Sequence, residues 1–231
     1  MDDDRLITLQ QNLKRRYDIE EFPLSIGQTE LQWLRIQNTD QLFDELLARD
    51  SDDPDLEDER MPYWADLWPA ALALSQYLLR NQELLLGKPA LEIGCGLGLC
   101  GMIAASVGAR VTLSDYMPEP LEVVRYLWLL NRNEEPDLLQ LDWRYPPSNL
   151  QFDLLLASDV SYEAKSHKPL IGAIRKLLKP GGRVLLSEPR RSTANAFFKL
   201  LAQEGFLCER KEELVRMSGQ IVTVDVYEIR V

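Results

Sequence analysis

The fold of this chain is decided by the stretch Leu91-Glu92-Ile93-Gly94-Cys95-Gly96-Leu97-Gly98. Its apolar first residues predict a strand. The glycines predict a tight turn that opens into a helix, because glycine lets the backbone approach a ligand without interference from a Cβ. In a second frame, Gly96, Gly98 and Gly101 spell G-x-G-x-x-G, with Asp115 at about the distance that a dinucleotide site requires. The glycines alone leave the identity of the ligand ambiguous.

A repeated strand-then-helix rhythm surrounds this stretch and predicts an α/β fold. Apolar strands are expected near residues 90–94, 110–115, 138–141, 153–158 and 183–187, with helices at about 98–107, 118–131, 169–178 and 192–204. Helical crossovers between short apolar strands imply a parallel sheet with helices on both faces. Residues 206–214 and 221–229 flank Ser218-Gly219, which is a hairpin signal. We therefore predict a Rossmann-like seven-strand sheet, mostly parallel, that finishes in a C-terminal antiparallel hairpin.

The N-terminal part of the chain predicts an appendage to this sheet. Residues 1–60 are interpreted as the appendage and residues 61–231 as one larger domain, since 231 residues suffice for a single α/β domain. The appendage is expected to hold strands at 17–26 and 31–36, a helix at 40–49 and an acidic linker. After the linker, residues 66–80 predict a helix, because Pro69 suits a first turn.

The acidic linker, residues 50–59, carries seven acids and no base within a chain of net charge −11. A mobile, solvated segment is the simplest interpretation. The alternative is a segment that attracts a basic substrate to a nearby cavity mouth. The negative net charge argues against tight binding to nucleic acid, which requires cations to displace counterions from phosphates.

The apolar runs and the N-terminus bear on the compartment. The apolar runs are far shorter than the ~20 residues needed to cross a bilayer. The acidic start Met1-Asp2-Asp3-Asp4 is unlike a secretory signal. We expect a cytoplasmic protein, most simply a monomer, with neither a membrane nor a nucleic acid as partner.

The cysteines and the single histidine argue against several kinds of chemistry. Cys95, Cys100 and Cys208 are odd in number and lack Cys-x-x-Cys spacing. We expect them to be small buried side chains, and predict neither a disulfide framework nor a metal site. His167 is expected in an exposed turn, which argues against a histidine-led catalytic triad.

Three further features favour S-adenosylmethionine as the ligand of the glycine turn. Glu92 precedes the first glycine by two residues, where it can reach a cationic amino-acid end and would repel a pyrophosphate. Asp115 ends the next strand and can accept both ribose hydroxyls. Asp142-Trp143 follows the third strand, offering an acceptor for the adenine amino group and an aromatic face for its ring.

With these residues, the sequence resembles the class I methyltransferases, and within them the non-histone protein lysine methyltransferases, over roughly residues 60–231. The matching elements are Leu67-Trp68-Pro69-Ala70-Ala71, Trp143 and the Asp-x-x-Tyr motif Asp159-Val160-Ser161-Tyr162. The resemblance implies that Trp68 and Ser158 also contact the cofactor. The candidate cofactor-binding residues are thus Trp68, Glu92, Gly94, Cys95, Gly96, Gly98, Asp115, Asp142, Trp143 and Ser158.

The acceptor side of the site is assigned to Asp159 and Tyr162. Both follow the fourth strand, at the edge where ligands of open α/β sheets bind. The resemblance implies a protein lysine as acceptor, whose amine must arrive neutral although its free pKa is about 10.4. We expect Asp159 to orient this amine as a catalytic residue and Tyr162 to wall the channel.

Three alternatives stay open at this point. A small-molecule N- or O-methyltransferase would use the same cofactor site. A non-catalytic cofactor-binding or interaction protein would keep the fold without turnover, and a nicotinamide-dependent oxidoreductase would use the glycine turn for a dinucleotide. The segment Ser187-Glu188-Pro189-Arg190-Arg191, after the fifth strand, matches no pattern that identifies a substrate.

Overall fold

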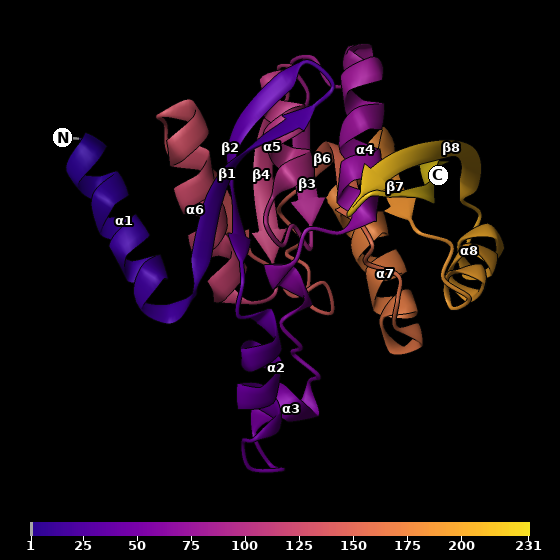
Figure 1. The fold of residues 1–231 in the computed structure, drawn as a ribbon. Coiled ribbons are helices and arrows are strands. Elements are labelled where there is room, and N and C mark those ends of the chain that lie inside the picture. The colour runs from indigo at the N-terminus through magenta and orange to yellow at the C-terminus, as the bar shows by residue number, and fades with distance from the viewer. Residues whose placement is uncertain (1) are drawn as a thin grey trace.

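The computed structural model describes residues 2–231 and has a seven-stranded sheet at its centre (Figure 1). The strand order is β5-β4-β3-β6-β7-β9-β8, with β3 to β7 parallel to one another and β9 antiparallel to both of its neighbours. This confirms the predicted mostly parallel sheet with a C-terminal hairpin. The strands are β3 (Pro89–Ile93), β4 (Arg110–Asp115), β5 (Asp137–Gln140), β6 (Phe152–Ser158), β7 (Leu178–Glu188), β8 (Leu207–Met217) and β9 (Gln220–Arg230).

Helices cover both faces of the sheet, as predicted. One face carries α4 (Pro69–Arg80), α5 (Leu99–Ser106) and α6 (Pro118–Arg132), and the other carries α7 (His167–Leu177) and α8 (Ala194–Gln203). The strand β6 shows why two faces are needed. Leu154 and Leu156 join the core under the first set of helices, whereas Leu155 and Ala157 join the core under the second, as the two-residue period of a strand requires.

The N-terminal residues form a helix and a hairpin that pack on α6. The elements are α1 (Asp2–Arg16), β1 (Ile19–Ile26) and β2 (Thr29–Ile36), and α1 was not predicted from the sequence. The hairpin is anchored by Trp33, which is 0% exposed, and by Asn131 of α6, whose side chain bonds both the N–H and the C=O of Gln32. Apolar packing and paired backbone groups thus attach this hairpin to the main sheet.

The next segment leads to the carboxyl edge of the parallel strands. It holds α2 (Thr39–Leu47), α3 (Pro54–Glu57) and the 3-10 turn η1 (Tyr63–Ala65), with η2 (Gln82–Leu84) and η3 (Ala164–Ser166) later in the chain. The arrowheads of β3 and β4 point toward the end of the molecule from which α2 and α3 project (Figure 1). The strand order reverses between β3 and β6, which is where open α/β sheets form their ligand crevice.

Three sequence expectations need correction. The helix expected from residue 66 begins at Pro69, because a residue before proline favours an extended backbone and Trp68 adopts ψ 149°. His167 is 2% exposed, because its ring packs against Phe197 of α8, with centroids 5.4 Å apart, and its Nε2 bonds the Ser161 carbonyl. Cys208 is exposed on β8, whereas Cys95 and Cys100 are buried as expected.

Residues 2–231 offer neither a membrane-spanning helix nor a group of metal-ligating side chains. No helix in residues 2–231 is both long and apolar enough to cross a membrane. Among the same residues, no three or more His, Cys, Asp or Glu side chains are grouped so that they could hold a metal ion.

Candidate functional site

A cavity of about 920 Å³ lies at the carboxyl edge of the sheet. Its wall comes from the loops after β3, β4, β5, β6 and β7 and from the segment that precedes α4. The structure brings eleven of the twelve predicted site residues to this one wall. They are Trp68, Gly94, Cys95, Gly96, Gly98, Asp115, Asp142, Trp143, Ser158, Asp159 and Tyr162.

The glycine turn has the backbone shape for which glycine is needed. Gly94, Gly96 and Gly98 have φ of 62°, 50° and 75°, values that other residues adopt only at a cost. A Cβ on Gly94 would lie 3.1 Å from Val160 Cγ1 and 3.4 Å from the Trp143 ring. Gly94 therefore keeps the cavity open beside Trp143, whereas Gly98 faces the packed core.

Glu92 is the predicted site residue that the structure does not bring to the cavity. It is 1% exposed, and its Oε2 accepts a bond from the Gly101 backbone N–H at 2.7 Å. Burial raises the pKa of Glu92 to about 8. The expected direct contact with a ligand is thus corrected: Glu92 lies beneath the turn and fixes the start of α5. A Cβ on Gly101 would lie 2.6 Å from this carboxylate, which explains the third glycine of the motif.

Asp115 presents a carboxylate at the cavity wall. Its Oδ2 accepts a bond from the Gly96 N–H at 3.0 Å and its Oδ1 accepts one from the Met117 N–H at 3.2 Å. Burial raises the pKa of Asp115 to about 6. Two carboxylate oxygens have about four acceptor positions, so both can still accept hydroxyl groups of a ligand.

Asp142 is held by a network that sequence reasoning missed. Both of its oxygens accept bonds from Arg144 Nε, at 3.0 and 2.9 Å. Arg144 also bonds Asp58 at 2.9 Å and the Tyr116 hydroxyl at 2.8 Å, and Tyr116 stacks with Arg60, whose Cζ lies 4.6 Å from the ring centroid. The hydrogen bonds from Arg144 and Tyr116 hold the pKa of Asp58 well below its usual range.

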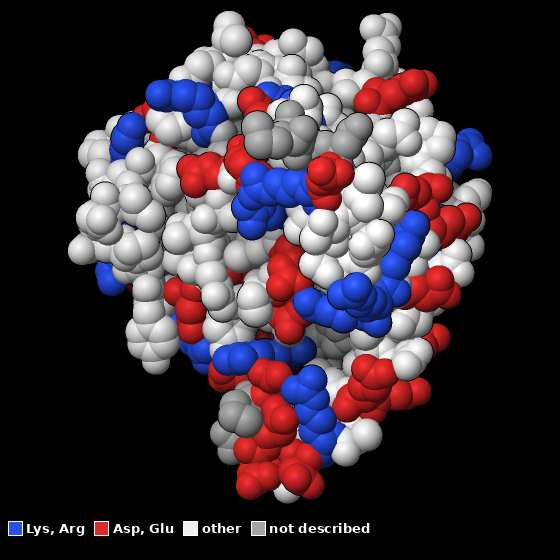
Figure 2. Space-filling view, turned by 90° about the vertical axis from the view of Figure 1, so that its left-hand side faces the viewer, with Lys and Arg blue, Asp and Glu red and all other residues white. Residues whose placement is uncertain are grey.

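This network attaches the acidic segment to the cavity. Asp55 and Asp58 of that segment both pair with Arg60, at 2.7 and 3.3 Å. Figure 2 shows acidic side chains crowded at the lower end of the molecule, where α2 and α3 project, with basic side chains among them. The segment is thus folded in part, and several of its charges are paired. Arg60, which directly follows the run of acids in the sequence, was the available sequence signal for this arrangement.

Aromatic side chains wall another part of the cavity. The Trp68 Nε1–H donates to the Tyr63 carbonyl at 2.8 Å. The Tyr63 ring meets the Tyr162 ring edge to face, with centroids 5.7 Å apart, and Phe43 of α2 packs on Tyr63 with centroids 5.4 Å apart. Tyr63 was not predicted to belong to the site. Burial raises the pKa of Tyr162, so its hydroxyl stays protonated at neutral pH.

Asp159 is paired with an arginine that the sequence did not identify. Its two oxygens accept bonds from Arg191 Nε at 2.8 Å and from Nη2 at 2.6 Å. Arg191 lines the cavity, and its Cζ lies 5.7 Å from the Trp68 ring centroid. The Asp159 backbone has φ 53°, a strained value of the kind that persists where surrounding contacts fix it. Because β6 and β7 are neighbours in the sheet, the residues that follow them lie side by side. The expected pairing of these two strands was the only signal that could have pointed to Arg191.

Solved structures show the same fold. A putative RNA methyltransferase from Pyrococcus horikoshii is 15% identical with TM-score 0.56, over 84% of this chain and 96% of that one. The N-methyltransferase NodS from Bradyrhizobium japonicum, solved with S-adenosyl-L-homocysteine, is 21% identical with TM-score 0.53, over 83% and 98%. The chain therefore has the seven-strand α/β fold that these two solved methyltransferases share.

Sequence comparison gives the family. A family model described as lysine methyltransferase matches residues 56–204, and the chain belongs to this S-adenosylmethionine-dependent family. This confirms the predicted resemblance and the expected cofactor class.

Individual relatives differ in the acceptor that their names state. Mouse EEF1A lysine methyltransferase 3 is 30% identical over 184 residues, which is 74% of each chain. The human histone-arginine methyltransferase METTL23 is 35% identical over 130 residues, covering 52% of this chain and 66% of the relative. The rat protein of that name is 31% identical over 148 residues, covering 57% and 64%. The chain thus spans less than two thirds of the length of these two arginine methyltransferases.

Proposed function

We propose that this protein transfers the methyl group of S-adenosylmethionine to the side-chain amine of a lysine in a protein. The proposal rests on one observation: the candidate cofactor residues Asp115 and Trp143 line the same cavity as the candidate acceptor residues Asp159 and Tyr162. Membership of the lysine methyltransferase family supports the choice of acceptor.

The residues of the cavity fit S-adenosylmethionine. The glycine turn leaves room where a Cβ on Gly94 would meet Trp143. Asp115 has acceptor positions for two ribose hydroxyls, and Trp143 lies beside the turn to face an aromatic base. Gly94, Gly96, Asp115 and Trp143 would therefore hold the cofactor, with Trp68 and Ser158 completing the wall.

The cofactor supplies a methyl group that is already activated on a sulfonium, so the protein has to supply alignment and exclusion of water. Asp159 is assigned to orienting the acceptor amine, as a carboxylate can accept a bond from an N–H group. Tyr162 and Tyr63 wall the approach with rings that exclude water from it. These roles need no strong base, since the proton on the amine can leave to water.

Asp159→Asn tests the acceptor assignment, because it keeps the shape of the side chain and removes its charge. We expect single-turnover methylation to fall roughly tenfold or more, comparable to the loss of one charge-assisted contact. Cofactor affinity, measured by calorimetry on the same preparation, should change much less, since Asp115 and Trp143 remain.

A dialysed cell lysate supplies the acceptor proteins for this test, and labelled S-adenosylmethionine supplies the methyl group. The amount of methyl-lysine is measured after hydrolysis of the labelled protein. Full activity in Asp159→Asn, or a loss that reduced cofactor affinity explains entirely, would remove the basis for placing the acceptor at this residue. Label in the small-molecule fraction, with none in protein, would instead support a small-molecule methyltransferase.

A further inference from the structure

The charge around Asp159 decides which form of an acceptor amine the cavity favours. A lysine amine can accept a methyl group only through its free electron pair, so it must first lose its proton. A lone carboxylate beside the amine would stabilise the protonated form and raise the pKa of the amine. This inference rests on the proposed lysine acceptor.

The Asp159 carboxylate is not alone. Arg191 reaches it from the loop after β7 with two N–H donors, in the bidentate geometry that makes such pairs strong. The side chain of Asp159 is 7% exposed and that of Arg191 is 38% exposed. The arginine thus covers the carboxylate and faces the cavity with its remaining surface.

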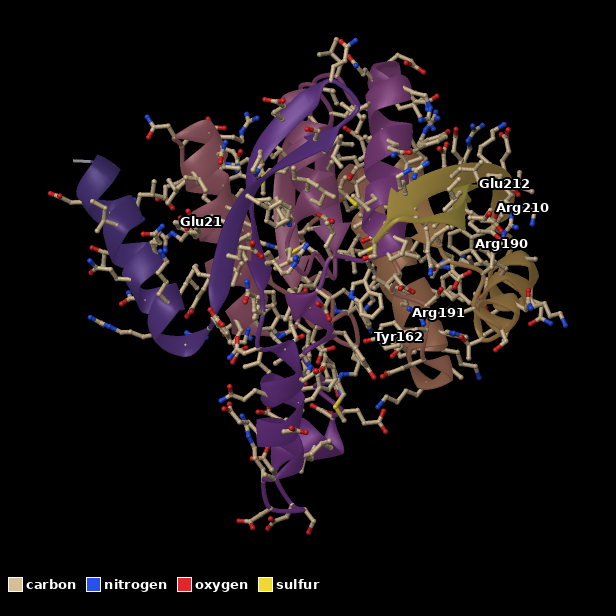
Figure 3. The ribbon with its side chains drawn as sticks, viewed as in Figure 1. Glu21, Tyr162, Arg190, Arg191, Arg210 and Glu212 are labelled. Atoms are coloured by element: carbon tan, nitrogen blue, oxygen red, sulfur yellow. The ribbon has the colours of Figure 1, made fainter. Side chains whose placement is uncertain are left out.

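The loop that carries Arg191 is itself fixed. The Arg191 backbone N–H donates to both oxygens of Glu188, at 2.8 and 3.1 Å, and the Asp159 N–H donates to the Ser187 carbonyl at 2.9 Å. Figure 3 shows Arg191 on the same side of the molecule as Tyr162, whereas Arg190 lies with Arg210 and Glu212 at the hairpin. Arg190 and Arg191 are adjacent in the sequence, but Arg190 pairs with residues of the hairpin and Arg191 lines the cavity.

Other charged and titratable groups act on the pair or line the same cavity. Tyr162 of the β6–α7 loop and Glu188 of β7 act on Arg191 directly. The rest of the cavity wall carries Asp58, Glu59, Arg60, Tyr63, Asp66, Asp115, Tyr116, Asp142, Arg144, Glu163 and Lys165. Lys165 is engaged by Glu59 and lies 3.8 Å from Glu163. Arg60 and Arg144 are likewise engaged by Asp55, Asp58 and Asp142, so Arg191 is the cation that pairs with Asp159.

We propose that Arg191 is a positioning and specificity residue that neutralises Asp159, so that the cavity accepts a primary amine in its uncharged form. Asp159 then orients the amine without holding it as an ammonium ion. The same pairing disfavours a guanidinium acceptor, because a guanidinium keeps its positive charge and would meet the Arg191 cation beside a carboxylate whose charge is already matched.

The test is the pH dependence of methyl-lysine formation in a dialysed lysate with labelled S-adenosylmethionine. Arg191→Met exposes an unpaired carboxylate, and the midpoint of the pH–rate profile should rise by about one unit or more. The rate near neutral pH should fall about tenfold and recover at alkaline pH. Arg191→Lys keeps a cation and should keep a midpoint close to that of the native protein.

Two further variants separate charge from structure. Asp159→Asn/Arg191→Met removes both charges, so the midpoint should return toward the native value while the maximal rate stays low. Arg190→Met is the matched control, because Arg190 belongs to the same loop and pairs with Asp225 at 2.8 Å, away from the cavity. Its midpoint should be unchanged. Calorimetric affinity for S-adenosylhomocysteine shows that each variant is folded.

The outcomes distinguish this inference from the proposed function. Methyl-lysine formation with an unshifted midpoint in Arg191→Met, and an equal loss at every pH, would overturn the role of Arg191 alone. Methyl-arginine in place of methyl-lysine, or no labelled protein with the native enzyme, would overturn the proposed acceptor as well.

Discussion

Asp115 is the single residue on which cofactor binding should depend most. Asp115→Ala removes a charged acceptor for two ribose hydroxyls, and such bonds contribute typically ~1.5–3 kcal/mol each. We expect S-adenosylmethionine affinity by calorimetry to fall at least tenfold. Because burial raises the pKa of Asp115 to about 6, native affinity should also weaken as the pH falls through 6, when the carboxylate gains a proton. Unchanged affinity in the variant, or binding of NAD by the native protein, would mean that the glycine turn holds another ligand.

The ionisation of Glu92 should change the free energy of unfolding of the protein, and Glu92 should make no contact with the ligand. Its pKa is raised by burial to about 8, above the ordinary value of 4.5, so the folded state binds a proton that the unfolded state has lost. Stability should therefore fall as the pH rises from about 4.5 to about 8. Glu92→Gln keeps an acceptor for the Gly101 N–H and cannot ionise, so its thermal midpoint should decline less over this range. An identical decline in both proteins would show that Glu92 is not the group responsible.

At the scale of elements, the acidic segment has two kinds of charge. Asp55 and Asp58 pair with arginines beside the cavity, whereas Asp50 and Asp52 are exposed. Neutralising Asp58 should loosen the contact with Arg144 and speed cofactor dissociation by roughly up to fivefold, the range of a partly exposed ion pair. Neutralising Asp50 and Asp52 should leave dissociation unchanged and slow the encounter with a basic partner at low salt only.

Stopped-flow measurement of dissociation and of turnover at two salt concentrations checks both expectations. If neutralising Asp58 and neutralising Asp50 and Asp52 changed cofactor dissociation equally, the acidic segment would not contain two kinds of charge. A fall in turnover that is the same at low and high salt would show that Asp50 and Asp52 act on structure and not on encounter.

The alternating elements could be predicted because each is decided locally. Short apolar strands, the glycine turn and the Ser218-Gly219 hairpin each have their own sequence signal. The helix α1 was missed because most of its residues are polar, and its packing partner α6 lies about a hundred residues further along the chain. Residues of the cavity wall could be named where one strand end carries its own motif, as at Asp115 and Asp159, and their roles stay predictions.

Contacts between distant segments could not be predicted in the same way. Arg191, Tyr63 and Arg144 join the site through the sheet order and the folding of the N-terminal segment. Glu92 was misplaced because its position beside the glycine turn does not reveal which face of β3 it occupies, and that face is set by packing against α5.

At the scale of the whole molecule, the sheet brings a cofactor wall and an acceptor wall to the same cavity. The strand order reverses between β3 and β6, so the loops after these strands diverge and leave the crevice between them. The N-terminal segment closes one side through Asp58 and Tyr63. A monomer would suffice for this arrangement, which stays a prediction that light scattering can check.

Identification of the labelled product is the decisive measurement for methyl transfer to a protein lysine. The native protein is incubated with dialysed lysate and methyl-labelled S-adenosylmethionine, and the labelled species are separated and hydrolysed. We expect label in protein as methyl-lysine, and strongly reduced label in Asp115→Ala and Asp159→Asn. Label confined to small molecules, or found as methyl-arginine, would contradict it.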